Sequence, residues 1–244
     1  MKNIIDPAPI PMIPVINIID SDSDEGFSTG SEPIYDSQFP VRRIYCVGRN
    51  YAAHAREMGF DDREPPFFFS KPADSIVVNP KRLAYPKMTN DLHHEVELVV
   101  AIGEPAESVT AEQAEQCILG YALGIDLTKR DLQTEAKKKG LPWELAKGFD
   151  QCAPISSIIL KEELGLVTSG AISLSVDNYV KQSADISDMI WSVSEIISEL
   201  SNHIALQPGD LIFTGTPEGV GPIQKGQLVQ AEMLNRLKLA FTVV

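Results

Sequence analysis

The chain has 244 residues, of which 43% are hydrophobic and 23% are charged, and its formal net charge is −13. This composition is that of an ordinary globular protein with an ample core. The acidic balance argues against nucleic acid or an anionic membrane as the main partner, because both require clustered Lys and Arg. Three cysteines without a close CxxC pair predict neither a disulfide framework nor a zinc site. With no long apolar run and no secretory signal pattern, we expect a cytoplasmic protein.

Residues 1–40 are rich in proline and carry an acidic run, DSDSDEG, which we interpret as a solvated loop. Proline lacks an amide hydrogen, so it favours extended segments and sheet edges. We therefore expect residues 1–40 to form an extended arm with at most one edge strand, around Val15 to Ile19. We expect this arm to pack on a main body formed by residues 41–244.

Regular structure is predicted to begin at VRRIYCVGRNY, with a strand over residues 44–47. Asn50 can then cap a short helix over residues 51–58. A second strand, over residues 67–70, should stop at Lys71-Pro72, because the residue before proline is disfavoured in a helix.

Strands and helices are predicted to alternate in the middle of the chain. The apolar run LHHEVELVVAIG predicts one buried strand. Thr110 and Gln113 form a capping box for a helix that runs to about Leu119. GYALGID predicts another buried strand, and a second helix is expected from Thr128 to about Lys139.

Short β segments dominate the chain from Ile172 onward. ISLSVDNYVKQ predicts a hairpin with Asp177-Asn178 at its tip. A helix is predicted over residues 188–201, and DLIFTGTP and QLVQAEM predict two more strands.

Three acidic residues are candidates for a metal site. Side chains two apart on a strand point the same way, so Glu95 and Glu97 share one face with His93. Like charges repel unless a cation lies between them, and hard divalent cations bind carboxylate oxygens. Asp126, at the polar end of the next strand, could join the two glutamates around magnesium or manganese. The alternative is that Glu95 and Glu97 lie on an exposed strand edge and that Asp126 caps the following helix.

The stretch GRNYAAHAREMG contains a second candidate group. His54 and Glu57 are three apart on the predicted helix, so they share a face and can hydrogen-bond, which would orient the imidazole and raise its basicity. On a lone short helix such a pair is more often solvated. Four cationic side chains could complete an active site, although each alone would be a surface charge: Arg49, Lys71, Arg130 and Lys147.

The Gly-rich turn in DLIFTGTPEGVG is a candidate anion-binding segment. Backbone N–H groups near Gly215 and Thr216 could receive an anionic ligand. The turn lacks the GxxxxGK[ST] order of a nucleotide-binding loop, so we exclude nucleotide binding.

Seven stretches together resemble the successive motifs of the fumarylacetoacetate hydrolase family, in the family's order, over roughly residues 41–244. They are YCVGRNYAAHAREMG, FSKPAD, LHHEVELVVAIG, GYALGIDLTKRDLQ, KKKGLPWELAKGFD, SDMIWSVSEIIS and LQPGDLIFTGTPEGVGP. The resemblance is closest to the short bacterial fumarylpyruvate hydrolases and related acylpyruvases. It implies an α+β fold, a mixed β-sandwich roll with peripheral helices, that assembles as a homodimer.

The resemblance also assigns roles to residues. It implies that Glu95, Glu97 and Asp126 bind one magnesium or manganese ion per subunit, and that His54 and Glu57 form a water-activating dyad. The positions that match the family's substrate site are Lys71, Arg130, Gln133, Lys147 and Thr216, to which we add Arg49 and Gly215. Either Lys147 or Lys71 could stabilise an oxyanion during catalysis.

The implied reaction is the hydrolysis of an acylpyruvate, a 2,4-dioxo acid that can chelate a metal through its carboxylate and 2-oxo oxygens. His54 would take a proton from water as the water attacks the distal carbonyl, and cleavage would give pyruvate and a second acid. We expect fumarylpyruvate as the substrate and a dyad segment that closes as a lid. Decarboxylation of oxaloacetate or tautomerisation of a 2-oxo acid is the alternative, because the same site serves them. A non-catalytic metal-binding protein would lack one of the named groups, and none is missing.

Overall fold

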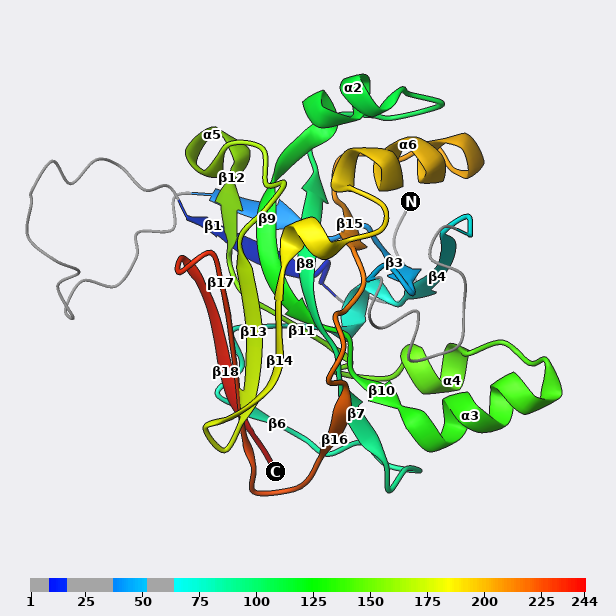
Figure 1. Cartoon of the computed structure of the whole chain (residues 1–244), viewed down its shortest axis with the longest axis vertical. Helices are drawn as coiled ribbons and strands as arrows, with labels where there is room; N and C mark the ends of the chain where they lie inside the picture. Colours follow the sequence, from blue (N-terminus) through cyan, green and yellow to red (C-terminus); the bar gives the residue numbers. More distant parts are fainter. Residues whose placement is uncertain (1–8, 17–36, 52–63) are drawn as a thin grey trace, which may run out of the picture.

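A computed structural model describes residues 9–16, 37–51 and 64–244 of the chain. Three β-sheets of ten, five and three strands form its framework, and short helices lie at the periphery (Figure 1). The predicted α+β fold, a mixed β-roll with peripheral helices, is confirmed. Within these described ranges, no helix is long and apolar enough to span a lipid bilayer.

The strands divide among the sheets as follows. The ten-stranded sheet contains β1 (Met12–Ile16), β2 (Ser37–Pro40), β3 (Arg43–Gly48), β4 (Phe67–Lys71), β5 (Ile76–Val78), β8 (Val96–Ile102), β9 (Ile118–Ile125), β11 (Ala153–Ile155), β12 (Ile158–Leu160) and β15 (Asp210–Phe213). The five-stranded sheet contains β6 (Arg82–Leu83), β13 (Ala171–Val176), β14 (Tyr179–Asp185), β17 (Leu228–Met233) and β18 (Leu237–Val243). The three-stranded sheet contains β7 (Leu92–His94), β10 (Thr128–Lys129) and β16 (Gly221–Ile223).

The helices are short. The α-helices are α2 (Ala111–Ala114), α3 (Arg130–Lys139), α4 (Glu144–Lys147), α5 (Lys161–Leu164) and α6 (Val193–His203). Single 3₁₀ turns lie at η1 (Ala73–Ser75), η2 (Glu115–Cys117) and η3 (Ile186–Asp188).

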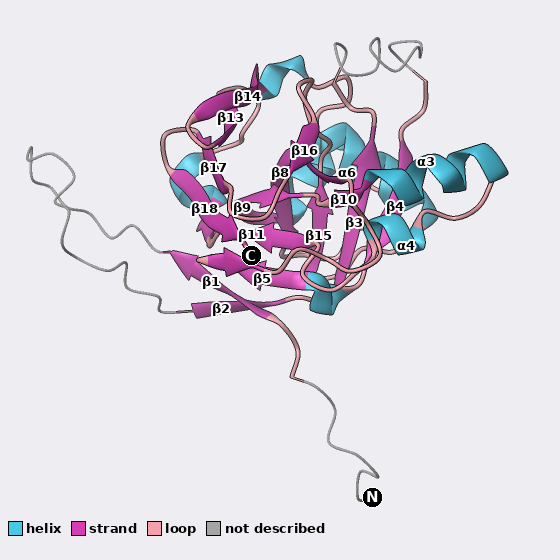
Figure 2. Cartoon of the chain, turned by 90° about the horizontal axis from the view of Figure 1, so that it is seen from below, coloured by secondary structure: helices cyan, strands magenta, loops and turns pink. Residues whose placement is uncertain are grey.

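Strand β8 is buried on both faces and separates two parts of the core. Leu98 and Val100 belong to a cluster shared with the five-stranded sheet, whereas Val99 and Ala101 belong to a cluster shared with β1 and β15. Alternate side chains of a strand point to opposite faces, which explains why this segment reads as a continuous apolar run. Figure 2 shows β13, β14, β17 and β18 on one side of the molecule and β1 with β2 on the other.

The described part of the arm packs on the main body as expected, but it contributes two strands. β1 pairs in parallel with β12 and antiparallel with β2, so β1 lies inside the sheet and β2 forms the edge. The prediction of at most one strand, at an edge, is therefore wrong. Residues 37–40 pair with a segment more than 20 residues away in the chain, and such long-range pairing leaves no local periodic signal.

Two local predictions are confirmed by their backbone geometry. Thr110 and Gln113 form the capping box at the start of α2. The tip of the hairpin is at Asp177-Asn178, as predicted. These two residues have φ values of 51° and 67°, which is the left-handed conformation that Asp and Asn tolerate. The first helix is shorter than predicted, because β9 already begins at Ile118 and only a 3₁₀ turn separates it from α2.

Two predicted helices begin later than expected. α3 begins at Arg130, because Thr128 belongs to β10 and its hydroxyl donates a hydrogen bond to Asp126 O at 3.3 Å. α6 begins at Val193, where Ser192 caps it, whereas residue 188 belongs to η3. In both places an earlier polar residue has another local partner, so it does not start the helix.

Candidate active site

The stretch LHHEVEL forms two strands that separate at Glu95, rather than the single predicted strand. β7 belongs to the three-stranded sheet and β8 to the ten-stranded sheet. The neighbouring segment changes sheets at the same level, because β9 ends at Ile125 and β10 begins at Thr128. The N–H of Asp126 donates to the carbonyl oxygen of Glu95 at 2.8 Å. Glu95 and Asp126 therefore lie side by side where the two sheets meet.

Glu95, Glu97 and Asp126 form one buried cluster. Their exposed fractions are 7%, 2% and 0%, and one carboxylate oxygen from each lies within 4.8 Å of the others. The alternative interpretation, an exposed strand edge with a helix-capping aspartate, is wrong on both points. The cluster is buried, and the residue that precedes α3 is Lys129.

Cationic side chains compensate most of this negative charge. Lys147 Nζ lies 2.8 Å from Glu95 Oε2 and 2.6 Å from Asp126 Oδ2, and Arg130 also pairs with Glu95. Burial alone would raise the pKa of Glu95, but Lys147 and Arg130 lower it below its ordinary value. Burial alone would likewise lower the pKa of Lys147, but Asp126 and Glu95 raise it. Glu95 and Lys147 are therefore both charged.

Glu97 has different surroundings. Its Oε2 accepts a hydrogen bond from the N–H of Gly215 at 2.8 Å. Burial, together with the nearby charges of Asp126 and Glu95, raises the pKa of Glu97 well above its ordinary value. Asp126 Oδ1 is also buried and accepts no aligned hydrogen bond from any described residue, although Lys71 Nζ lies 2.7 Å away.

These oxygens fit a hard divalent cation. A cation with oxygen ligands would offset the charge repulsion at Glu97 and contact the Asp126 oxygen that lacks an aligned donor. The three residues present are thus suited to magnesium or manganese.

Replacing Lys147 with Met should destabilise the metal-free protein. Without the ammonium group, Glu95 and Asp126 lose a shared buried partner, and we expect a loss of about 3 to 5 kcal/mol in the free energy of unfolding measured in EDTA. Since the substitution also removes a positive charge beside the proposed metal site, Mn²⁺ should raise the melting temperature of the variant more than that of the wild type. Lys139→Met, which alters an exposed ion pair with Glu135, is the control. If Mn²⁺ raised the melting temperature of neither the wild type nor Lys147→Met, the assignment of the cluster as a metal site would be contradicted.

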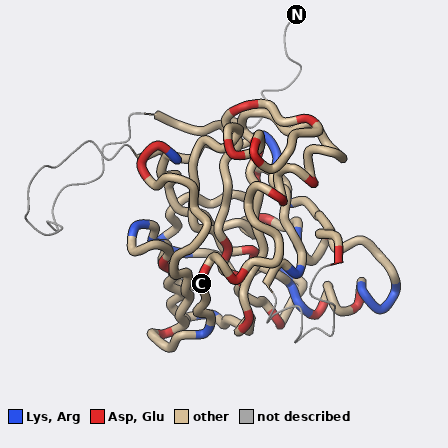
Figure 3. The backbone as a smooth tube through the Cα atoms, turned by 45° about the horizontal axis from the view of Figure 1, so that its top comes forward, with Lys and Arg blue, Asp and Glu red and all other residues tan. Residues whose placement is uncertain are grey.

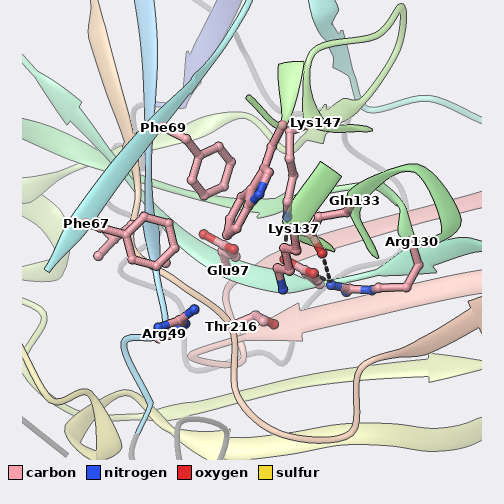
Figure 4. A pocket seen from close by; sticks show the side chains of 13 residues that line it. Arg49, Phe67, Phe69, Glu97, Arg130, Gln133, Lys137, Lys147 and Thr216 are labelled. Carbon is pink, nitrogen blue, oxygen red and sulfur yellow. Dashed lines mark hydrogen bonds and ion pairs between the residues drawn. The ribbon is translucent and has the colours of Figure 1, made fainter. Parts of the chain in front are cut away.

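A pocket lies over the acids and holds about 430 Å³ of empty space, its open mouth included. Seven of the predicted site residues line it: Arg49, Glu95, Glu97, Arg130, Gln133, Lys147 and Thr216. In Figure 4 two walls face each other across the pocket, with Phe67 and Phe69 on one side and Gln133, Lys137 and Arg130 on the other.

Three predicted residues lie deeper than the pocket wall. The Lys71 side chain is fully buried, and its Nζ contacts Asp126 and the carbonyl oxygens of Leu127 and Lys147, the latter at 2.6 Å. Asp126 is fully buried and contacts Lys147 Nζ. Gly215 has a φ of +96°, and its N–H is directed at Glu97, so the anion that this turn receives is a side chain of the protein itself.

The proposed dyad, His54 and Glu57, and residues 52–58 of the helix predicted to carry it lie outside the described residues. Their roles therefore stay predictions. The predicted cap is wrong, because the Asn50 side chain hydrogen-bonds Trp191 and Thr214, and Tyr51 forms a β-bridge with Met189.

Arg49 directly follows β3 and has a left-handed φ of 61°. Its guanidinium carbon lies 5.3 Å from the ring centre of Phe67.

Several residues of the pocket were not predicted from the sequence. Lys137 lies one turn after Gln133 on α3, a spacing of four that places both on one helix face and could have identified it. Lys137 Nζ lies 4.9 Å from the ring centre of Trp143, which in turn makes an edge contact with Phe67. Nothing in the local pattern separates Trp143 and Phe67 from ordinary core aromatics.

The pocket wall is rich in positive charge although the whole chain is acidic. Four cationic side chains line it, against two carboxylates: Arg49, Arg130, Lys137 and Lys147. Figure 3 shows Lys and Arg positions along α3, on the side of the molecule that carries this wall. Burial and the neighbouring charges of Arg130 and Arg49 lower the pKa of Lys137. Such a wall favours an anionic ligand.

Comparisons with known proteins identify the family of the chain. The family described as "Fumarylacetoacetate (FAA) hydrolase C-terminal" matches residues 43–244. The crystal structure of fumarylpyruvate hydrolase from Pseudomonas aeruginosa, in complex with Mn²⁺ and pyruvate, has 45% sequence identity and a TM-score of 0.88, and the match covers 100% of this chain and 99% of that chain.

Two further relatives carry different names. Oxaloacetate tautomerase FAHD1 of Homo sapiens is 40% identical over 202 residues, which cover 83% of this chain and 91% of the relative. Oxaloacetate decarboxylase of Dictyostelium discoideum is 40% identical over 190 residues, which cover 78% of this chain and 87% of the relative. The resemblance found in the sequence is thereby confirmed, and the chain belongs to the fumarylacetoacetate hydrolase family.

Proposed function

We propose that the protein is a metal-dependent hydrolase that cleaves the carbon–carbon bond of an acylpyruvate, with fumarylpyruvate as the favoured substrate. The observation that carries this proposal is the buried cluster of Glu95, Glu97 and Asp126 beneath a pocket with a cationic wall. The similarity to the Pseudomonas aeruginosa fumarylpyruvate hydrolase supports it.

The cofactor we propose is one magnesium or manganese ion per subunit, held by Glu95, Glu97 and Asp126. When bound, such an ion supplies Lewis-acid stabilisation of the negative charge that develops on the pyruvate portion as the bond breaks. Lys71 then has a positioning role, because its contacts hold Asp126 and the backbone of Lys147.

The remaining residues of the pocket bind and orient the substrate. We propose that Arg130, Gln133 and the backbone N–H of Thr216 bind the pyruvate carboxylate, and that the Lys147 ammonium binds an oxyanion; all four residues line the pocket. His54 is proposed to take the proton from the attacking water, and Glu57 to orient the imidazole. This division of roles makes binding and proton transfer separable by mutation.

The test of the proposed function is a substrate panel assayed with magnesium and with manganese. Fumarylpyruvate should give fumarate and pyruvate. The second candidate, decarboxylation or tautomerisation of oxaloacetate, is favoured by the two relatives named for those reactions. Carbon dioxide and pyruvate, or the keto–enol exchange of oxaloacetate, without cleavage of any acylpyruvate would reject the hydrolase in favour of that candidate.

Lys137 should recognise the second carboxylate of an acylpyruvate that carries one. In Lys137→Gln we expect the KM for fumarylpyruvate to rise about fivefold, which corresponds to about 1 kcal/mol for a partly exposed ion pair. The KM for acetylpyruvate, which has no second carboxylate, should stay unchanged. Lys138→Gln, on the next position of the same helix, is the control. Equal changes for both substrates would show that Lys137 does not contact the acyl group.

The proposed assembly is a homodimer in the cytoplasm that binds neither nucleic acid nor membrane. Light scattering of the purified protein measures the first part of this proposal directly. A monomer at micromolar concentration would contradict it.

A further inference from the structure

Gln182 is a buried polar residue on an otherwise exposed part of an edge strand. It lies on β14, where its three preceding neighbours in the strand and Ser183 are exposed, yet its own exposed fraction is 1%. Its carboxamide makes four hydrogen bonds, which is the full capacity of two acceptor and two donor positions. Its position and its contacts both differ from those of a solvent-facing glutamine.

The carbonyl half of this amide holds the residues on both sides of Glu95. Oε1 accepts hydrogen bonds from the backbone N–H of Val96 at 3.1 Å and from Nδ1 of His94 at 2.9 Å. The backbone N–H can only donate, so it identifies the atom facing it as the oxygen. Because His94 and Val96 flank Glu95, these two bonds fix the chain at the break between β7 and β8.

The amino half holds the turn that contacts the second glutamate. Nε2 donates to Thr216 Oγ1 at 2.8 Å and to the carbonyl oxygen of Pro217 at 2.9 Å. The Thr216 hydroxyl donates in turn to the carbonyl oxygen of Val96 at 2.9 Å. Gly215, which precedes Thr216 in the chain, donates its N–H to Glu97 Oε2. One amide thus connects the segment of Glu95 to the turn that holds Glu97.

A β-bulge directs Gln182 inward. The pairing of β13 with β14 shifts between Leu174 and Ser175, which face Gln182 and Val180, so that Lys181 is the extra residue. Bulges re-aim side chains and are frequent beside active sites. Gly219, in the loop after Pro217, lies so close to the carbonyl oxygen of Lys181 that a Cβ atom there would collide with it. The bulge and this loop are packed directly against each other.

We propose that Gln182 is a positioning residue of the metal site, which sets the relative placement of Glu95, Glu97 and Thr216 from a third sheet. The proposal rests on the proposed metal site but not on the identity of the substrate. Groups that orient metal ligands typically change metal affinity or activity 10- to 100-fold when they are removed.

Its test is Mn²⁺ binding to the full chain with Gln182→Met, which keeps the length of the side chain and removes all four hydrogen bonds. We expect Mn²⁺ affinity, measured by calorimetry, to fall at least about tenfold. The electron paramagnetic resonance spectrum of the bound Mn²⁺ should also change, because the symmetry of its ligands changes. Ser183→Ala, an exposed position next to Gln182, is the control and should match the wild type in both measurements.

The spectrum of the bound ion separates positioning from a loss of folded protein, which would lower the amount bound without altering the signal. Should the Met variant fail to fold, Gln182→Asn keeps the amide but is one methylene too short to reach both segments, and it should show the same two changes. A Gln182 variant that folds and keeps wild-type affinity and spectrum would overturn the inference. A wild-type protein that binds no Mn²⁺ would overturn both the inference and the proposed function. Mn²⁺ binding that depends on Gln182, without acylpyruvate cleavage, would support the inference and reject only the proposed reaction.

Discussion

Asp126→Asn should lose tight Mn²⁺ binding, by a factor of about 100 or more, together with all measurable turnover. The amide keeps the shape of the side chain but removes a charged oxygen donor from the cluster, and the loss of a ligand exceeds the 10- to 100-fold effect of removing a group that only orients one. Asn is preferred to Ala, because Ala would leave Lys71 and Lys147 facing an empty space in a fully buried site. Calorimetric titration with Mn²⁺ measures the affinity.

The control for this substitution is Asp150→Asn, the same chemical change at an exposed position three residues after Lys147. It should keep both the affinity and the turnover of the wild type. Unchanged Mn²⁺ affinity in folded Asp126→Asn protein would remove Asp126 from the ligand set and with it the proposed site.

His54→Ala should lose acylpyruvate hydrolysis by a factor on the order of 100 or more, the usual scale for a general base. The variant should still bind oxalate, an inert chelating analogue, because His54 is proposed to act on water and not on the metal or the bound ligand. Oxaloacetate decarboxylation needs no attacking water, so it should survive. Glu57→Gln should lower hydrolysis in the same direction but less, since it weakens only the orientation and charge of the dyad.

Steady-state rates with the two substrates, and oxalate affinity measured alongside, test this division of roles. His203→Ala changes an exposed histidine at the end of α6 and serves as the control. Full hydrolase activity in His54→Ala would refute the role proposed for the GRNYAAHAREMG segment. A parallel loss of oxalate binding would instead place His54 among the groups that bind the ligand.

The acidic cluster could be predicted because its signals are local. The period of two along a strand places Glu95 and Glu97 on one face, and the next strand ends in Asp126. The break of the strand at Glu95 could not be predicted in this way, since the apolar run on either side is continuous. It depends on where a neighbouring segment changes sheets, which is a property of tertiary structure.

The role of Gln182 shows the limit of local patterns most clearly. In ISLSVDNYVKQ it is one polar residue on a hairpin strand, where such residues usually face solvent. Only the bulge at Lys181 turns it inward, and only the folded chain brings it to His94 and Thr216, which lie 88 and 34 residues away in sequence. The position of Lys137 in the pocket could have been predicted, because its spacing of four from Gln133 on a helix is visible in the sequence.

The chain crosses between the three-stranded and the ten-stranded sheet before β8 and again after β9, and this crossing also positions α3. β10 leads directly into α3, so the helix that bears Arg130, Gln133 and Lys137 extends from the same crossing that contains Glu95 and Asp126. A rotation of the three-stranded sheet would therefore move the α3 wall of the pocket together with Glu95 and Asp126. A cation bound to Glu95, Glu97 and Asp126 would connect the two sheets at this crossing, and metal binding would then also fix the position of the pocket wall on α3.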